Sequence, residues 1–303
     1  MTASTEARLV ALGEASPDEW MALSTSAHWN QTEADWQTML GLGRGWGWGL
    51  RAPGERGPDT LVASTLVLPY ETRFAWISMV LVLPKHRGRG HARRLLGLAL
   101  DDLGSRGLLP LLDATPAGRP VYLKHGFVDA WGFERWRRKA NAGALPGDAV
   151  APPRVRPLRE ADWPAIGALD APAFGASRLP LLRALARRLP GAAWVMEGER
   201  ALRGFVFGRD GRTALQLGPL VADDDGAGIA LLSAALGALQ RSGAANGRDL
   251  IVDLRSGREP LAAWLRERGF APERPFTRMV HGAQEKAPGD ARRVCLVAGP
   301  ELG

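Results

Sequence analysis

The sequence predicts two α/β domains in tandem, and three observations lead to that expectation. The chain has 303 residues, which at roughly 150 residues per domain corresponds to two domains. Its residues are 46% hydrophobic and 23% charged, as in a packed globular protein. The same order of elements occurs twice, on either side of a segment rich in proline and glycine. We therefore expect a first domain at 1–140, a linker at 141–153, a second domain at 154–282 and a loosely packed tail at 283–303.

In the first half, local signals place each element. Ser16 followed by Pro17 is a helix start, and runs of valine, isoleucine and leucine bounded by turn residues indicate strands. An amphipathic stretch follows the glycine-rich turn after the second such run. The expected elements are an extended segment at 7–12, helices from 17 and at 32–42, strands at 61–68 and 74–83, a helix at 93–103, a strand at 108–112, a short helix at 119–125 and a strand pair at 127–138.

The second half repeats this order of elements and the turn signals between them. In both halves a short helix ends in Gly-Phe, at Gly126-Phe127 and at Gly269-Phe270. The expected elements are a strand at 155–158, helices from 159 and at 179–189, strands at 193–197, 202–208 and 213–221, a long helix at 227–242, a strand at 250–254 and a helix at 260–268.

Composition excludes several classes of protein. The single cysteine, Cys295, cannot form an intrachain disulfide, and the five histidines lack ligand spacing, so we expect no metal site. The net charge is +7, but most of the basic residues are interleaved with acidic ones. The sequence lacks the broad basic stripe and the stacking aromatics that are typical of a nucleic-acid binder. The uncharged stretch 226–240 is too short to span a bilayer, and we expect no secretory leader in the first residues. We expect a cytoplasmic protein that binds neither nucleic acid nor membrane.

The turn between the strand at 74–83 and the helix at 93–103 carries the clearest chemical signal. It reads Pro-Lys-His-Arg-Gly-Arg-Gly-His-Ala over residues 84–92. Glycines allow the backbone to approach a ligand, and free N–H groups at a helix start bind anions. Arg87 and Arg89 add positive charge. The turn is neither a Walker loop nor a Rossmann fingerprint, so these features predict a pyrophosphate cradle of another kind.

The same residues resemble the acetyl-CoA signature of the GCN5-related N-acetyltransferases, which reads Arg/Gln, two residues, Gly, one residue, Gly/Ala. Arg87, Gly90 and Ala92 occupy its fixed positions. Residues 112–127 resemble the family's second landmark, a strand and small turn followed by a helix with a tyrosine and a terminal Gly-Phe. The resemblance covers roughly residues 7–139 and implies, for each domain, a mixed and mostly antiparallel sheet flanked by helices.

The resemblance also implies how acetyl-CoA would be held and used. The backbone of Val80 and Val82 would hold the pantetheine arm and polarise the thioester carbonyl, and Tyr122 would protonate the departing thiolate after direct attack by an amine. The pyrophosphate would lie against the turn residues Arg87, Gly88, Arg89, Gly90, His91 and Ala92.

The general base and the acceptor pocket are less well defined. Glu71, before the central strand, and Asp113, after the next one, are carboxylates that could accept the amine proton, although a carboxylate at such a position is more often a loop or capping residue. Trp46, Trp48 and Trp76 could line an acceptor pocket, although aromatic residues on strands usually belong to the core.

The second half resembles a copy without this chemistry, like the C-terminal half of bacterial tandem acetyltransferases. Alignment on the long helices places Asp223, Asp224 and Asp225 where the first half has its basic turn, and alignment on Gly-Phe places Leu265 at the position of Tyr122. Three carboxylates repel a pyrophosphate. We therefore expect a second domain that does not bind CoA and that either walls the acceptor cleft or supplies a homodimer surface. A weaker alternative is that the aspartates attract a cationic acceptor.

The predicted function is that of an acetyl-CoA-dependent N-acetyltransferase (an acyltransferase) with one active site in the first domain. The acceptor would be the primary amine of a small molecule or peptide. A non-catalytic acyl-CoA-binding or interaction module is the alternative, and the retained Tyr122 favours the enzyme.

Overall fold

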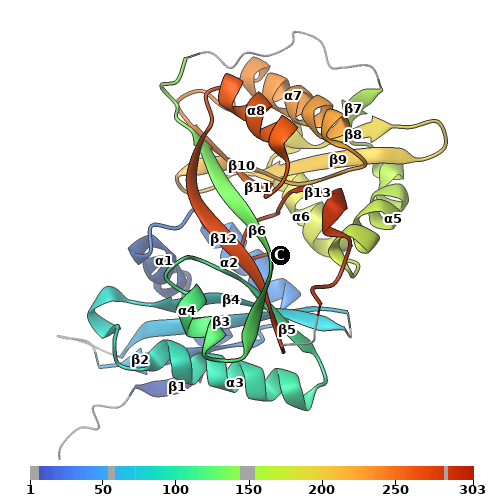
Figure 1. Ribbon diagram of the computed structural model, residues 1–303. Coiled ribbons are helices and arrows are strands. Elements are labelled where there is room, and N and C mark those ends of the chain that lie inside the picture. The colour runs from blue at the N-terminus through green and yellow to red at the C-terminus, as the bar shows by residue number, and fades with distance from the viewer. Residues whose placement is uncertain (1–6, 54–58, 72, 144–153, 283–285) are drawn as a thin grey trace, which may run out of the picture. The chain divides into compact units, whose positions relative to one another are not determined.

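A computed structural model describes residues 7–53, 59–71, 73–143, 154–282 and 286–303 of the chain. Its contacts divide the chain into two compact units, residues 1–112 with Leu302 and residues 113–301 with Gly303. Each unit is built on a mostly antiparallel sheet with helices packed against it (Figure 1). The predicted fold class is confirmed. The predicted linker at 141–153 lies largely outside the described residues, so its place as a domain boundary stays a prediction; by contacts, the two units adjoin in sequence after residue 112.

The first unit has the strand order β1-β2-β3-β4-β5. β1 to β4 are antiparallel, whereas β5 runs parallel to β4. Both N-terminal helices begin with a capping box, made by Ser16 with Glu19 and by Thr32 with Asp35. The elements are β1 Arg8–Ala11, α1 Pro17–Ser26, α2 Glu33–Leu42, β2 Gly47–Ala52, β3 Thr60–Tyr70, β4 Phe74–Val82, α3 His91–Ser105 and β5 Leu109–Ala114.

The second unit has the strand order β12-β6-β11-β13-β10-β9-β8-β7, with β10 also paired to β11. The β10–β11 pair is parallel and its neighbours are antiparallel. Its strands are β6 Phe127–Arg138, β7 Val155–Pro157, β8 Trp194–Glu197, β9 Leu202–Arg209, β10 Ala214–Ala222, β11 Asp249–Arg255, β12 Ala271–His281 and β13 Val294–Leu296.

Helices cover the sheet of the second unit, with α7 and α8 on one face and α5 and α6 on the other (Figure 1). The core under α7 and α8 is continuous and includes Leu231, Leu236 and Leu261. The helices are α4 Arg119–Leu123, α5 Trp163–Phe174, α6 Leu179–Arg188, α7 Asp225–Arg241 and α8 Glu259–Glu267.

The structure corrects the expected strand pair at 127–138. These residues form one twelve-residue strand, β6. One edge of β6 pairs with β11 and the other with β12, both from the second half of the sequence. The second unit is therefore built from both sequence halves.

The expectation of a loosely packed tail is wrong for residues 294–301. Cys295, Leu296 and Ala298 are completely buried. β10 and β11 pair from Ala214 to Leu217 and then separate, and β13 lies between them: Leu296 pairs with Leu220 on one side and with Leu254 on the other. The Val297 N–H extends this contact by donating to the Asp253 carbonyl at 2.9 Å. The C-terminal segment thus fills the opening between two diverging parallel strands.

Candidate functional site

A β-bulge in β4 reshapes the strand predicted to hold the pantetheine arm. The β3–β4 register shifts between Ser64 and Leu66, so that β4 has one extra residue. Met79 in this bulge has a φ of 49° although it is not glycine, and it is buried. The Ser64 hydroxyl donates to the Met79 carbonyl at 2.7 Å and holds the bulge in place. A strained, over-determined backbone of this kind is typical of functional positions.

The bulge lies where β4 loses its second neighbour within the first unit. β4 pairs with β5 from Phe74 to Trp76 only, so Val80 and Val82 follow the paired part. The Leu83 N–H donates to Val62 on β3 at 2.9 Å. Successive residues direct their backbone groups to opposite edges, so those of Val82 face away from β3. There the Val82 carbonyl accepts a hydrogen bond from Arg87 Nε at 3.1 Å, which leaves its N–H as the group available to a ligand.

Two glycines in left-handed conformations shape the turn that follows. Gly88 has a φ of 75° and Gly90, the N-cap of α3, a φ of 80°. No side chain caps the helix. The N–H groups of residues 88–92 donate to no backbone carbonyl in the part of the chain that the structure describes. A row of N–H groups without a backbone acceptor at a helix start fits an anionic ligand.

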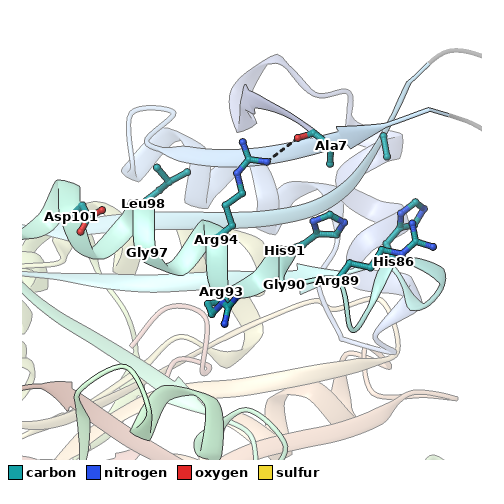
Figure 2. A pocket seen from close by; sticks show the side chains of 11 residues that line it. Ala7, His86, Arg89, Gly90, His91, Arg93, Arg94, Gly97, Leu98 and Asp101 are labelled. Carbon is teal, nitrogen blue, oxygen red and sulfur yellow. Dashed lines mark hydrogen bonds between the residues drawn. The ribbon is translucent and has the colours of Figure 1, made fainter. Parts of the chain in front are cut away.

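A basic hollow of about 640 Å³ lies beside this turn (Figure 2). Positively charged or imidazole side chains dominate its wall, and Asp101 is its one carboxylate among the described residues. The His86 and His91 rings are 6.4 Å apart. Burial lowers the pKa of His91, and His86, Arg89 and Arg94 lower it further. The same positive field favours an anion. The lining residues are Ala7, Ala52, His86, Arg89, Gly90, His91, Arg93, Arg94, Gly97, Leu98 and Asp101.

The corresponding turn of the second half is closed by its own side chains. Asp224 caps α7, its carboxylate accepting from the Ala227 N–H at 2.7 Å. Asp224 also pairs with Arg203 at 2.6 Å, and Asp225 pairs with Arg258 at 2.7 Å. A side chain of the protein itself therefore caps the start of α7. Asp224 and Asp225 already have cationic partners within the protein, which argues against a site for a cationic acceptor.

The structure does not bring Glu71 to the turn. Glu71 is exposed in the connection between β3 and β4, at the opposite end of β4 from Arg87. At ~3.3 Å per residue, the distance along the strand from Glu71 to Val80 is roughly 30 Å.

The side chain of Asp113 is completely buried in the second unit, and an arginine pairs with it. Both carboxylate oxygens accept hydrogen bonds from Arg278, each at 2.9 Å. Burial raises the pKa of Asp113 to about 6, against the opposing effect of Arg278. A pKa near neutrality suits a base, but oxygens that are sealed from solvent and already paired cannot reach an acceptor amine.

Tyr122 lies on α4 in the second unit and is partly buried. Its ring contacts Phe127 edge-on, with centroids 5.9 Å apart. Burial raises the pKa of Tyr122 to about 12, and its hydroxyl makes no hydrogen bond to a residue that the structure describes. A neutral phenol with a free hydroxyl can donate a proton at physiological pH.

Of the tryptophans that could line an acceptor pocket, Trp76 is buried in the core of the first unit. Trp46 has the Arg106 guanidinium 4.2 Å above its ring.

Comparison with known families gives each half the same assignment. A model of the acetyltransferase (GNAT) family matches residues 16–127, and a model of an acetyltransferase (GNAT) domain matches residues 166–293. The chain belongs to the GCN5-related N-acetyltransferase (GNAT) family. It is a tandem GNAT protein, as the repeat predicts. No curated protein matches the chain by sequence.

Solved structures of acetyltransferases share the fold of almost the whole chain. A candidate acetyltransferase from Pyrococcus horikoshii has a TM-score of 0.73 at 19% identity, covering 100% of this chain and 98% of its own. A GCN5-related N-acetyltransferase from Sphaerobacter thermophilus has a TM-score of 0.63 at 15% identity, covering 93% and 96%. A tandem GNAT protein from the clavulanic acid biosynthesis pathway has a TM-score of 0.60 at 15% identity, covering 93% and 100%. At these identities the likeness concerns the fold.

Two absences among the described residues complete the description. No helix in them is long and apolar enough to cross a membrane. No group of three or more histidine, cysteine or carboxylate side chains in the described ranges is arranged to hold a metal ion.

Proposed function

We propose that the protein is an acetyl-CoA-dependent N-acetyltransferase with one working cofactor site, at the start of α3. The observation that carries this is the uncommitted row of N–H groups at residues 88–92, which follows the bulged β4 and lies beside a basic hollow. The pyrophosphate would accept hydrogen bonds from these groups, with Arg87 and Arg89 supplying positive charge. The β4 backbone beyond the bulge would bind the pantetheine arm. We propose that the protein acts in the cytoplasm.

The chemistry that we propose is direct transfer to a primary amine of a small molecule or peptide. The amine nitrogen attacks the thioester carbonyl carbon, the carbonyl oxygen becomes an oxyanion, and a backbone N–H of the bulged strand stabilises it. The C–S bond then breaks. Tyr122 protonates the leaving thiolate, and the new amide nitrogen loses its proton.

Neither predicted base suits that last proton. Asp113 is sealed by Arg278, and Glu71 lies at the far end of β4. We propose that both protons pass to water: the ammonium form of the acceptor loses one before the amine attacks, and the amide nitrogen loses the other, which restores the Tyr122 phenol. We therefore expect kcat/KM to rise with pH up to the pKa of the acceptor amine.

The second half, in this proposal, does not bind CoA. Three observations support this: Asp224 caps α7 in place of a ligand, Leu296 and its neighbours fill the opening between β10 and β11, and the buried Leu265 stands at the position of Tyr122.

A thiol-release assay with acetyl-CoA over a panel of peptides, polyamines, amino acids and aminoglycosides tests the function, beside calorimetry with acetyl-CoA alone. We expect saturable binding and turnover with at least one class of amine. Tight binding without turnover on any amine would favour the acyl-CoA-binding module, and absence of binding would refute both.

A further inference from the structure

The segment that carries Tyr122 is tied at its beginning to the second half of the sequence. Asp113 precedes α4, and its carboxylate accepts both hydrogen bonds of the Arg278 fork from β12. The side chains are 0% and 7% exposed, respectively. The Arg278 guanidinium also lies 4.2 Å from the centre of the Trp131 ring. Because a buried, bidentate ion pair of this kind has one geometry, it fixes where the segment starts.

The same strand ties the end of the segment. β12 pairs with β6 so that His281 lies opposite Phe127, and their rings meet edge-on at 5.2 Å. Phe127 in turn contacts the Tyr122 ring. The Gly282 N–H donates to the Gly126 carbonyl at 2.9 Å. Gly126 has a φ of 82°, and a Cβ there would stand 3.1 Å from His281 Nε2. The turn is therefore shaped to receive the His281 ring.

Between these two ends, α4 is held to β6 by an exposed ion pair of Arg119 with Asp129, a kind of pair that contributes little to stability. It is five residues long, and Val121 and Leu123 on either side of Tyr122 are each 42% exposed. A helix of one turn has no stability of its own. The position of the phenol therefore depends on where the ends of the segment are fixed.

We propose that Arg278 and His281 are positioning residues for Tyr122, and that the second half of the chain is retained because β12 orients the proton donor of the first half. This rests on the role of Tyr122 in the proposed function. It gives the second half a part in catalysis without a cofactor site of its own.

The chain contains a matched control for Arg278. Eight residues after each Gly-Phe stands an arginine, Arg135 in β6 and Arg278 in β12. Arg135 makes the equivalent buried ion pair with Asp253 on β11, at 2.7 and 2.8 Å. Both pairs lie in the second unit, but only Arg278 contacts the segment that carries Tyr122.

The kinetic experiment compares Arg278→Ala, His281→Ala and Arg135→Ala in the full chain. We expect kcat to fall about tenfold in the first two, since misplacing a catalytic group by about 1 Å costs up to 10²-fold, while the KM for acetyl-CoA stays within about twofold. Arg135→Ala should lose thermal stability as Arg278→Ala does but keep kcat. In a Tyr122→Phe background, Arg278→Ala and His281→Ala should lower kcat no further. Equal kcat losses in all three variants, or additive losses in that background, would overturn the proposal.

A second readout does not need activity and separates this proposal from the proposed function. Tyr70→Phe leaves Tyr122 as the only tyrosine of the chain, so alkaline titration of the phenolate absorbance reports Tyr122 alone. With the segment in place, its pKa should lie well above the ordinary value of about 10. It should fall toward that value in Arg278→Ala and in His281→Ala, but not in Arg135→Ala. His281→Ala keeps the ion pair and serves if Arg278→Ala fails to fold. An unchanged titration would overturn the positioning role even in a protein without turnover.

Discussion

Replacing Gly90 by alanine is a direct test of the anion cradle. Gly90 caps α3 with a φ of 80°, and a Cβ there would meet only Arg93 Nη2, at 3.9 Å. The change therefore adds no clash and acts through the backbone alone. A left-handed L residue costs about 1–2 kcal/mol. The variant either bears this cost in stability or relaxes to negative φ, which turns the following N–H groups away from the ligand.

The loss in affinity follows from the number of N–H groups that turn away. A hydrogen bond to a charged group contributes about 1.5–3 kcal/mol, so losing one raises the Kd for acetyl-CoA roughly ten- to a hundredfold. Calorimetry and thermal denaturation at one fixed salt concentration measure the two quantities.

Gly104→Ala is the matched control, because Gly104 lies near the other end of α3 with no atom within 4 Å of its would-be Cβ. Alanine within a helix is favoured over glycine by up to about 1 kcal/mol, so this variant should gain stability and bind acetyl-CoA unchanged. If Gly90→Ala also gains stability and binds as the wild type does, the left-handed cap is not part of the cofactor site.

Three further predictions concern the cofactor and the acid. Arg87→Glu should raise the Kd for acetyl-CoA about tenfold or more at low ionic strength and less at high salt, because screening weakens the interaction of exposed charges with phosphate; calorimetry at two salt concentrations checks this. Tyr122→Phe should lower kcat by about 10²-fold or more with little change in the KM for acetyl-CoA. The raised pKa of Tyr122, about 12, keeps the wild-type phenol protonated, so no alkaline loss of kcat from this group is expected below about pH 11. Asp223→Arg should leave the calorimetric stoichiometry at one acetyl-CoA per chain, and a stoichiometry of two would contradict the filled opening between β10 and β11.

Local sequence patterns were enough to predict the strand and the helix on either side of the glycine-rich turn at 84–92. The apolar run at 74–83 and the amphipathic stretch at 93–103 correspond to β4 Phe74–Val82 and α3 His91–Ser105 within two residues. The glycines between them need positive φ, which the sequence signals directly. By contrast, nothing local marks the bulge at Met79, because it arises from the register with β3 and the Ser64 hydroxyl.

Long-range partners account for the rest of what the sequence did not reveal. Asp113 looks like a free carboxylate at a strand end until Arg278, 165 residues later, is brought beside it. β13 lies within the apolar run 294–298, which we expected to belong to the tail, and it forms because β10 and β11 leave an opening of its size. The arginine eight residues after each Gly-Phe was the one available signal, and its meaning depends on how β6 and β12 pair.

The two helix starts differ in how their N–H groups are used. An N–H group at a helix start donates either to a side chain of the same protein or to a ligand. At α3 the cap is Gly90, which has no side chain to offer, whereas at α7 the Asp224 carboxylate takes the Ala227 N–H. Removing that cap would cost about 0.5–2 kcal/mol and would not by itself create a cofactor site.

The opening between the parallel strands β10 and β11 can likewise be filled either by the protein itself or by a ligand. In the second unit Leu296 fills it, completely buried and paired on both sides, and truncating such a leucine to alanine costs about 2–5 kcal/mol. Cofactor binding in the second half would therefore require both the cap and the inserted segment to be undone, each at a loss of stability. In the proposed function neither single change yields binding in return, so the closed state of the second half would be stable against stepwise reversal, and the second half would contribute to the chemistry through contacts such as those of β12.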